Sequence, residues 1–217
     1  LVTPKPGFLE GLRELCDAEG IVLIFDEVMS GFRLAQGGAQ EVYGVTPDIT
    51  TLGKIIGGGL PVGAYGGKAE IMDYVSPAGP IYQAGTLSGN PVAMHAGLTM
   101  LNLLQSDPAL YKRLDQSTAK LQQGMQERAD AAGIDLHINR VGSMLAFFFQ
   151  KGPVHNFDDA RNSDLEAFGL FFREMLVRGV YFPPSQFESL FISDCIKEDL
   201  LNHIFRAAEE TFAVMKG

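Results

Sequence analysis

The chain has 217 residues, of which 46% are hydrophobic and 20% charged, and this composition excludes a disordered, collagen-like or low-complexity protein. Its 26 acidic and 17 basic side chains give a net charge of -9, with no basic cluster, which argues against nucleic acid and anionic membranes as partners. Every apolar run is interrupted before the roughly 20 residues that a membrane-spanning helix needs. We therefore expect a soluble globular protein.

The few cysteines and histidines indicate neither disulfides nor a metal site. Cys16 and Cys195 are far apart in the chain, which favours a reducing compartment. We expect the cytoplasm, with the plastid stroma as the alternative. The first residue, Leu1, is not an initiator methionine, so we also expect that a longer polypeptide contains this chain. The histidines show no metal-ligand spacing; they are His95, His137, His155 and His203.

The first hundred residues alternate between helical and strand patterns. Apolar residues recur at helical spacing from Phe8 and stop before Gly20, which predicts a helix closed by a left-handed glycine. The continuous apolar run 21–25 predicts a buried strand of a parallel sheet. Shorter strands are predicted at 49–52 and 62–65. This order predicts an α/β doubly wound region.

The remainder of the chain predicts an α+β arrangement. A helix is predicted at 91–104, and a second from about 108 to 132, closed by Gly133. We place the domain boundary near Leu104, which divides the chain into 1–104 and 105–217. The further elements predicted are strands at 134–138 and 144–149 and amphipathic helices at 165–176 and 200–212.

Asp26 follows the predicted strand 21–25, at the edge where open α/β sheets bind ligands. A buried carboxylate there is costly unless it meets a cation or hydrogen-bond donors. A helix cap or a structural ion pair is the commoner explanation for an isolated aspartate in this position. Asp26 is therefore a candidate ligand-binding residue only if a second functional residue lies near it.

Lys54 provides that second residue, between a short predicted strand and the glycines 57–59. A desolvated lysine amine is a nucleophile that attacks aldehydes, although a lone lysine is more often a solvated surface residue. The glycines follow the lysine, which excludes a P-loop, and their spacing does not fit a dinucleotide-binding fingerprint. A strand ending in Asp and a later strand ending in Lys match two parts of a pyridoxal-phosphate enzyme.

Three stretches resemble the class III aminotransferases of the fold-type I group: 25–33 (FDEVMSGFR), 46–48 (TPD) and 53–63 (GKIIGGGLPVG). More narrowly, 77–91 (PAGPIYQAGTLSGNP) resembles the glutamate-1-semialdehyde 2,1-aminomutases, and the resemblance continues to 184–188. It covers the whole chain, as roughly the second half of such an enzyme. The implied fold is the C-terminal part of a fold-type I large domain followed by an α+β small domain.

The resemblance also implies a cofactor and its contacts. Pyridoxal 5'-phosphate, or its pyridoxamine form, would meet Asp26 at its pyridine nitrogen, Val28 on one ring face and Lys54 at its aldehyde. Gly85 and Thr86 would reach the cofactor phosphate of the neighbouring subunit in a homodimer. An ordinary N-cap loop is the alternative for residues 86–90.

Glu188 resembles a carboxylate near the family's active site, with a substrate or gating role, and a solvated loop glutamate is the alternative. The chain departs from the family pattern at Ser30, where threonine is expected, and at Gln36, where an aromatic residue is common. It also departs at 189–190 and 193–197, which leaves the role of Glu188 open.

The function implied by the resemblance is an isomerase that moves an amino group within one small molecule, converting glutamate 1-semialdehyde to 5-aminolevulinate for tetrapyrrole synthesis. Two alternatives remain open from the sequence. One is a class III aminotransferase that uses an external amino donor. The other is an inactive truncated module that keeps the fold for association only.

Overall fold

The computed structural model describes residues 1–217, which divide between two units. Residues 6–108 form what we call the amino-terminal unit, and residues 1–5 and 109–217 form the carboxyl-terminal unit. The boundary expected near Leu104 falls inside a helix that continues to Ser106, and the units divide after Pro108. The first five residues belong with the carboxyl-terminal unit, an arrangement that local sequence patterns do not encode.

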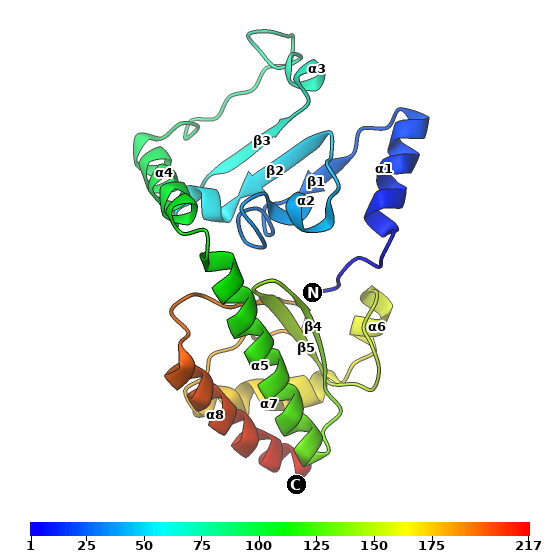
Figure 1. Ribbon diagram of the computed structural model, residues 1–217, viewed down its shortest axis with the longest axis vertical. Coiled ribbons are helices and arrows are strands. Elements are labelled where there is room, and N and C mark those ends of the chain that lie inside the picture. Colours follow the sequence, from blue (N-terminus) through cyan, green and yellow to red (C-terminus); the bar gives the residue numbers. More distant parts are fainter. The chain divides into compact units, whose positions relative to one another are not determined.

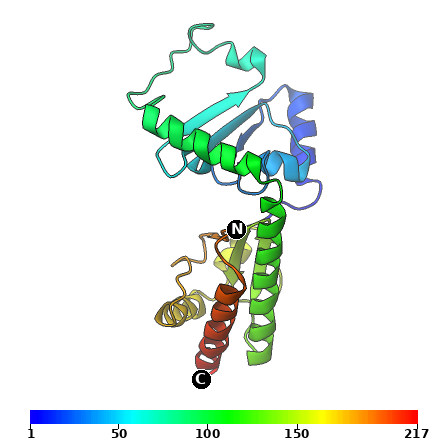
Figure 2. The ribbon, with the colours of Figure 1, turned by 60° about the vertical axis from the view of Figure 1, so that its left-hand side comes forward.

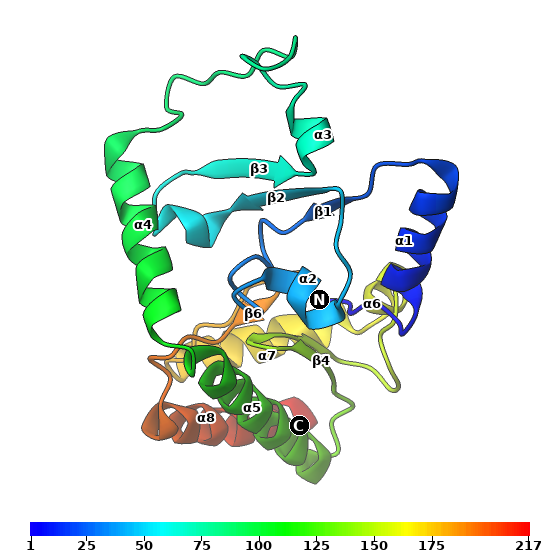
Figure 3. The same ribbon diagram turned by 45° about the horizontal axis from the view of Figure 1, so that its top comes forward.

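The amino-terminal unit is built on a three-stranded sheet of order β1-β2-β3 (Figure 1). The first two strands are parallel, with Asp26 opposite Thr51, and the third pairs antiparallel to the second. Helices lie at both ends of the strands in Figure 3, where α1 is at the amino ends of β1 and β2 and α4 is beside the carboxyl end of β2. The elements of this unit are α1 (Phe8–Glu19), β1 (Ile24–Asp26), α2 (Gly38–Tyr43), β2 (Ile49–Gly53), η1 (Lys54–Gly57), β3 (Gly63–Gly67), α3 (Ala69–Met72) and α4 (Pro91–Ser106).

Local signals correctly predicted where α1 ends and where α4 begins. Gly20 closes α1 with a φ of 66°, as expected for a left-handed C-cap. Pro91 occupies the first turn of α4, where a missing N–H carries no penalty. The short helices α2 and α3 were not predicted, because elements of six and four residues carry too little periodicity.

The strand predicted at 21–25 differs from the structure in position and burial. β1 begins only at Ile24 and includes Asp26. Ile21, Val22 and Ile24 are about half exposed, at 52%, 49% and 55%. No element of the chain covers this side of the sheet. An apolar run therefore predicts a strand, but what buries the strand depends on elements that the run does not specify.

The carboxyl-terminal unit packs helices against an antiparallel sheet of order β4-β5-β6. Figure 2 shows α5 and α8 side by side, in agreement with their extensive contacts. Gly133 closes α5 as predicted, with a φ of 72°, whereas β4 starts three residues later than expected. The elements are α5 (Leu110–Ala132), β4 (His137–Val141), β5 (Met144–Phe148), α6 (Phe157–Arg161), α7 (Leu165–Val177), β6 (Leu190–Phe191) and α8 (Glu198–Lys216).

The buried hydrophobic clusters lie entirely in the carboxyl-terminal unit. Phe171 is at the centre of the larger one and stacks on Phe182 and Phe212, with ring centroids 5.8 Å and 5.7 Å away. Aromatic contacts of this kind add to the free energy gained by burying the rings. This unit therefore has its own core, whereas the sheet of the amino-terminal unit has one exposed face.

Candidate active site

The sheet of the amino-terminal unit has two unlike faces. Side chains alternate along a strand, and register places Ile24, Asp26, Thr51 and Tyr65 on one face. We call this the open face, because Ile24 and Tyr65 are 55% and 43% exposed. The opposite face is covered by α2, whose Gln40 side chain donates to the Thr50 hydroxyl at 3.0 Å.

Asp26 lies at the carboxyl end of β1 on the open face. Its Oδ1 accepts hydrogen bonds from the Val28 backbone N–H at 3.0 Å and from the Thr51 hydroxyl at 3.3 Å. Both bonds use the same oxygen, and no lysine, arginine or histidine pairs with the carboxylate. The helix cap and the ion pair considered from the sequence are both absent. The other oxygen, Oδ2, has no hydrogen-bond partner.

Lys54 follows β2 directly, at the strand end next to that of Asp26. Its backbone has a φ of 48°, a left-handed value that is uncommon for a residue with a side chain and that often marks functional sites. The side chain is exposed, and its amine forms no hydrogen bond or ion pair. A carboxylate and an amine thus stand without ionic partners at adjacent strand ends.

Val28 lies next to the strand that leads to Lys54. A Cβ atom built on Gly53 would stand only 3.2 Å from Val28 Cγ1, so the absence of a side chain at Gly53 lets Val28 approach. Val28 therefore contacts both Asp26, through its N–H, and Gly53, the residue before Lys54.

Gly85 and Thr86 lie in an exposed turn before α4. The Asn90 side chain accepts from the N–H groups of Val92 and Ala93, so the first turn of α4 is capped by its own chain. Gly85 lines a cavity of about 700 Å³ together with Leu52. Thr86 is not part of that lining, and its hydroxyl has no hydrogen-bond partner.

Glu188 belongs to the carboxyl-terminal unit, where its side chain is exposed. Its loop is anchored by Gln186, which is 1% exposed, accepts from Ser163 Oγ at 2.9 Å and donates to the Ala160 carbonyl at 2.8 Å. Gln186 carried no signal in the sequence, because both partners lie more than twenty positions away. Glu188 thus belongs to a different unit from Asp26 and Lys54.

A second cluster of charges lies at the opposite edge of the sheet, just before β2. The buried Asp48 carboxylate pairs with Lys68 Nζ at 2.6 Å and Arg13 Nη1 at 3.0 Å and accepts from the Leu23 N–H at 2.6 Å. The Lys68 ammonium, the Leu23 N–H and the Arg13 guanidinium hold the pKa of Asp48 well below its usual range.

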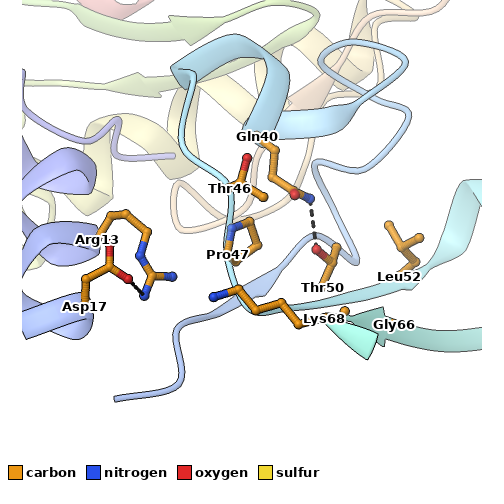
Figure 4. Close-up of a pocket in the computed structure, with 10 residues that line it drawn as sticks. Arg13, Asp17, Gln40, Thr46, Pro47, Thr50, Leu52, Gly66 and Lys68 are labelled. Carbon is orange, nitrogen blue, oxygen red and sulfur yellow. Dashed lines mark hydrogen bonds and ion pairs between the residues drawn. The ribbon is translucent and has the colours of Figure 1, made fainter. Parts of the chain in front are cut away.

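A pocket of about 460 Å³ adjoins this cluster, and Figure 4 shows Arg13 and Lys68 in its wall with Gln40 and Thr50. Both cations at the edge of the pocket already have carboxylate partners within the unit. Lys68 pairs with Asp48, and Arg13 pairs with Asp48 and with Asp17, the latter at 2.7 Å. We therefore assign the cluster to holding α1, β2 and β3 together.

No three His, Cys, Asp or Glu side chains gather as metal ligands would. None of the helices combines the length and apolar character needed to span a membrane.

The sequence profile of the family described as Aminotransferase class-III matches residues 1–207. The chain belongs to this family. It is 60% identical over 210 residues to the glutamate-1-semialdehyde 2,1-aminomutase of Cytophaga hutchinsonii, a match that covers 97% of this chain and 49% of that protein. The chain thus spans about half the length of the curated relatives it matches.

Solved structures of the family share the fold. An omega-transaminase from Sphaerobacter thermophilus superposes with a TM-score of 0.88 at 38% identity, covering 98% of this chain and 49% of that one. A transaminase with PLP bound gives a TM-score of 0.86 at 28% identity, covering 99% and 49%. These likenesses confirm the expected fold class, the C-terminal part of a fold-type I transferase.

Proposed function

We propose that this chain is part of an enzyme that converts glutamate 1-semialdehyde to 5-aminolevulinate by moving an amino group within the molecule. The observation that carries the proposal is that a carboxylate without an ionic partner, Asp26, and an amine without a partner, Lys54, are found at adjacent strand ends. The 60% identity to a protein named for this activity supports the choice of reaction.

Pyridoxal phosphate fits the chemistry of the residues at these strand ends. A flat pyridinium ring with an aldehyde needs a carboxylate, an apolar contact and an amine. Asp26 offers a free carboxylate oxygen, Val28 an apolar side chain, and Lys54 an amine with no other partner. When bound, the cofactor supplies an electron sink that allows amino groups to be exchanged.

The chain's own residues then have defined tasks. Asp26 would hold a proton on the ring nitrogen, and the donors Val28 N–H and Thr51 Oγ keep its other oxygen in place. Lys54 would hold the cofactor at its aldehyde, and its amine would carry protons to and from the substrate carbon.

The resemblance also supports an assembly in which two copies share their sites. We propose a homodimer in which Gly85 and Thr86 of one copy contact the cofactor phosphate of the other. The exposed turn and the unpartnered Thr86 hydroxyl support this role. Glu188, exposed on an anchored loop, is proposed as a substrate or gating carboxylate. The bacterial relatives support the cytoplasm as the proposed location.

A class III aminotransferase with an external amino donor is the second candidate, favoured by the 38% identity to an omega-transaminase. Both reactions use Asp26 and Lys54. They differ in whether an external donor is required. An inactive module, the third possibility, would bind no cofactor and would show no cofactor absorbance.

The deciding experiment uses the full-length enzyme, by which we mean a polypeptide of the relatives' length in which this chain forms the second half. The enzyme is loaded with pyridoxamine phosphate and given glutamate 1-semialdehyde without any amino acid donor. We expect many turnovers per site to 5-aminolevulinate. Consumption of only one equivalent of semialdehyde per site, with release of 4,5-diaminovalerate in place of 5-aminolevulinate and further consumption only after alanine or glutamate is added, would assign the protein to the aminotransferases.

A further inference from the structure

Glu27 is the most deeply buried acidic residue of the chain, with 1% of its surface exposed. Its carboxylate accepts four hydrogen bonds: from Ser30 Oγ at 2.7 Å, Ala39 N at 2.7 Å, Gln40 N at 3.0 Å and Gln40 Nε2 at 3.2 Å. No basic side chain pairs with it. A buried carboxylate without a cation is costly, and its hydrogen bonds alone offset that cost.

These bonds attach the end of β1 to the start of α2. The Glu27 N–H donates to the Thr51 carbonyl at 3.0 Å, which continues the pairing of β1 with β2 for one residue. The side chain binds α2 on the covered face. A Cβ atom on Gly38 would lie 2.3 Å from Glu27 Oε2, so the chain passes the carboxylate where only glycine fits. Glu27 thus joins the sheet to the segment 28–40.

The neighbouring residues connect this anchor to the candidate site. Because side chains alternate along an extended chain, holding Glu27 on the covered face directs Asp26 to the open face. Val28 follows Glu27 directly, and its N–H donates to Asp26 Oδ1. Any displacement of Glu27 therefore moves both Asp26 and Val28.

We propose that Glu27 is a positioning residue that sets Asp26 and Val28 for the cofactor ring by anchoring the segment 28–40 beneath the sheet. The inference rests on the proposed function. A purely structural role would require only that Glu27 stabilise the fold. A positioning role requires in addition that its effect on cofactor binding pass through Asp26.

The test is Glu27→Gln in the full-length enzyme, because the amide places an NH₂ group where the carboxylate meets only donors. We expect the Kd for pyridoxal phosphate to rise by about tenfold, the size of coupling found between neighbours in one network. The absorbance of the bound cofactor should also change its pH dependence. Glu41→Gln is the matched control: Glu41 is exposed and accepts a single bond from Gly37 N, so its Kd should be unchanged.

A double-mutant cycle with Asp26→Asn separates positioning from stability. If Glu27 acts by positioning Asp26 as well as Val28, Glu27→Gln causes a smaller loss of cofactor affinity in the Asp26→Asn enzyme than in the wild type. Equal losses in both backgrounds, or a lower melting temperature with an unchanged Kd, would overturn the inference.

If Glu27→Gln does not fold, Ser30→Ala removes one donor to the Glu27 carboxylate and should weaken cofactor binding in the same direction. An unchanged Kd in Ser30→Ala would count against the inference. A wild-type enzyme that binds no cofactor would instead refute the proposed function.

Discussion

Val28 packs against Gly53 so closely that a Cβ atom on the glycine would stand 3.2 Å from Val28 Cγ1 and 3.4 Å from the Val62 carbonyl. Gly53 directly precedes Lys54, so this contact joins two candidate cofactor residues. Glycine is needed at position 53 because a side chain would lack space, and not because of the backbone conformation. The φ of Gly53 is -167°, an extended value that any residue can adopt.

Gly53→Ala should therefore push Val28 away from the strand end. We expect a loss of about 1–3 kcal/mol in the free energy of unfolding, typical of an overpacked site, together with weaker retention of pyridoxal phosphate. Gly63→Ala is the matched control. Gly63 pairs with Gly53 across the sheet, but a Cβ atom there meets nothing within 4 Å. Equal effects of the two substitutions would show that the Val28 contact is unimportant.

Lys54→Ala should remove the covalent link between the full-length enzyme and its cofactor while leaving the fold intact, because the exposed side chain has no partner to lose. Lys54→Arg should not restore it, since a guanidinium stays protonated and is a poor nucleophile. Borohydride reduction followed by peptide mass mapping locates the link. Lys112→Ala, at an exposed lysine of the carboxyl-terminal unit, is the control. A cofactor adduct on another lysine in the wild-type enzyme would refute the assignment.

Thr86→Ala should weaken cofactor retention if its hydroxyl reaches the partner's phosphate. Mixed dimers of Lys54→Ala chains and Thr86→Ala chains then contain one site with both groups intact. We expect cofactor binding and activity to recover at that site, as measured after subunit exchange. No recovery, with exchange verified by differently tagged chains, would mean that Thr86 acts within its own subunit or not at all.

Asp48 should make the stability of the protein depend on pH. Its pKa in the folded state is lowered by Lys68, the Leu23 N–H and Arg13, whereas an unfolded aspartate titrates near pH 4. The unfolded chain thus takes up the proton first as pH falls, so Asp48 stabilises the fold above about pH 4 and loses this contribution at lower pH.

The difference in urea midpoint between wild type and Asp48→Asn should accordingly be largest near pH 7 and shrink between about pH 5 and pH 3. Asp17→Asn is the control, since the more exposed Asp17 pairs only with Arg13. A midpoint difference that is constant over this range would show that the carboxylate charge is not what stabilises the cluster.

Local patterns in the sequence were sufficient for several features. The helical spacing and terminal glycines predicted α1 and α5, because the left-handed caps at Gly20 and Gly133 depend only on neighbouring residues. The short strand before Lys54 was also predicted from the local sequence alone. The fold class followed from the resemblance, and the family profile and solved structures confirm it.

The tertiary structure decided what no local pattern contains. Glu27 meets donors 12 and 13 positions away, and Asp48 meets partners 25 and 35 positions away. Whether a carboxylate is buried, paired or free depends on which distant segments fold against it, so similar acidic side chains at Asp26, Glu27 and Asp48 have unlike surroundings. The apolar run 21–25 predicted a strand, but its exposure was decided by the absence of a covering element, because burial is a property of the packed chain rather than of the segment.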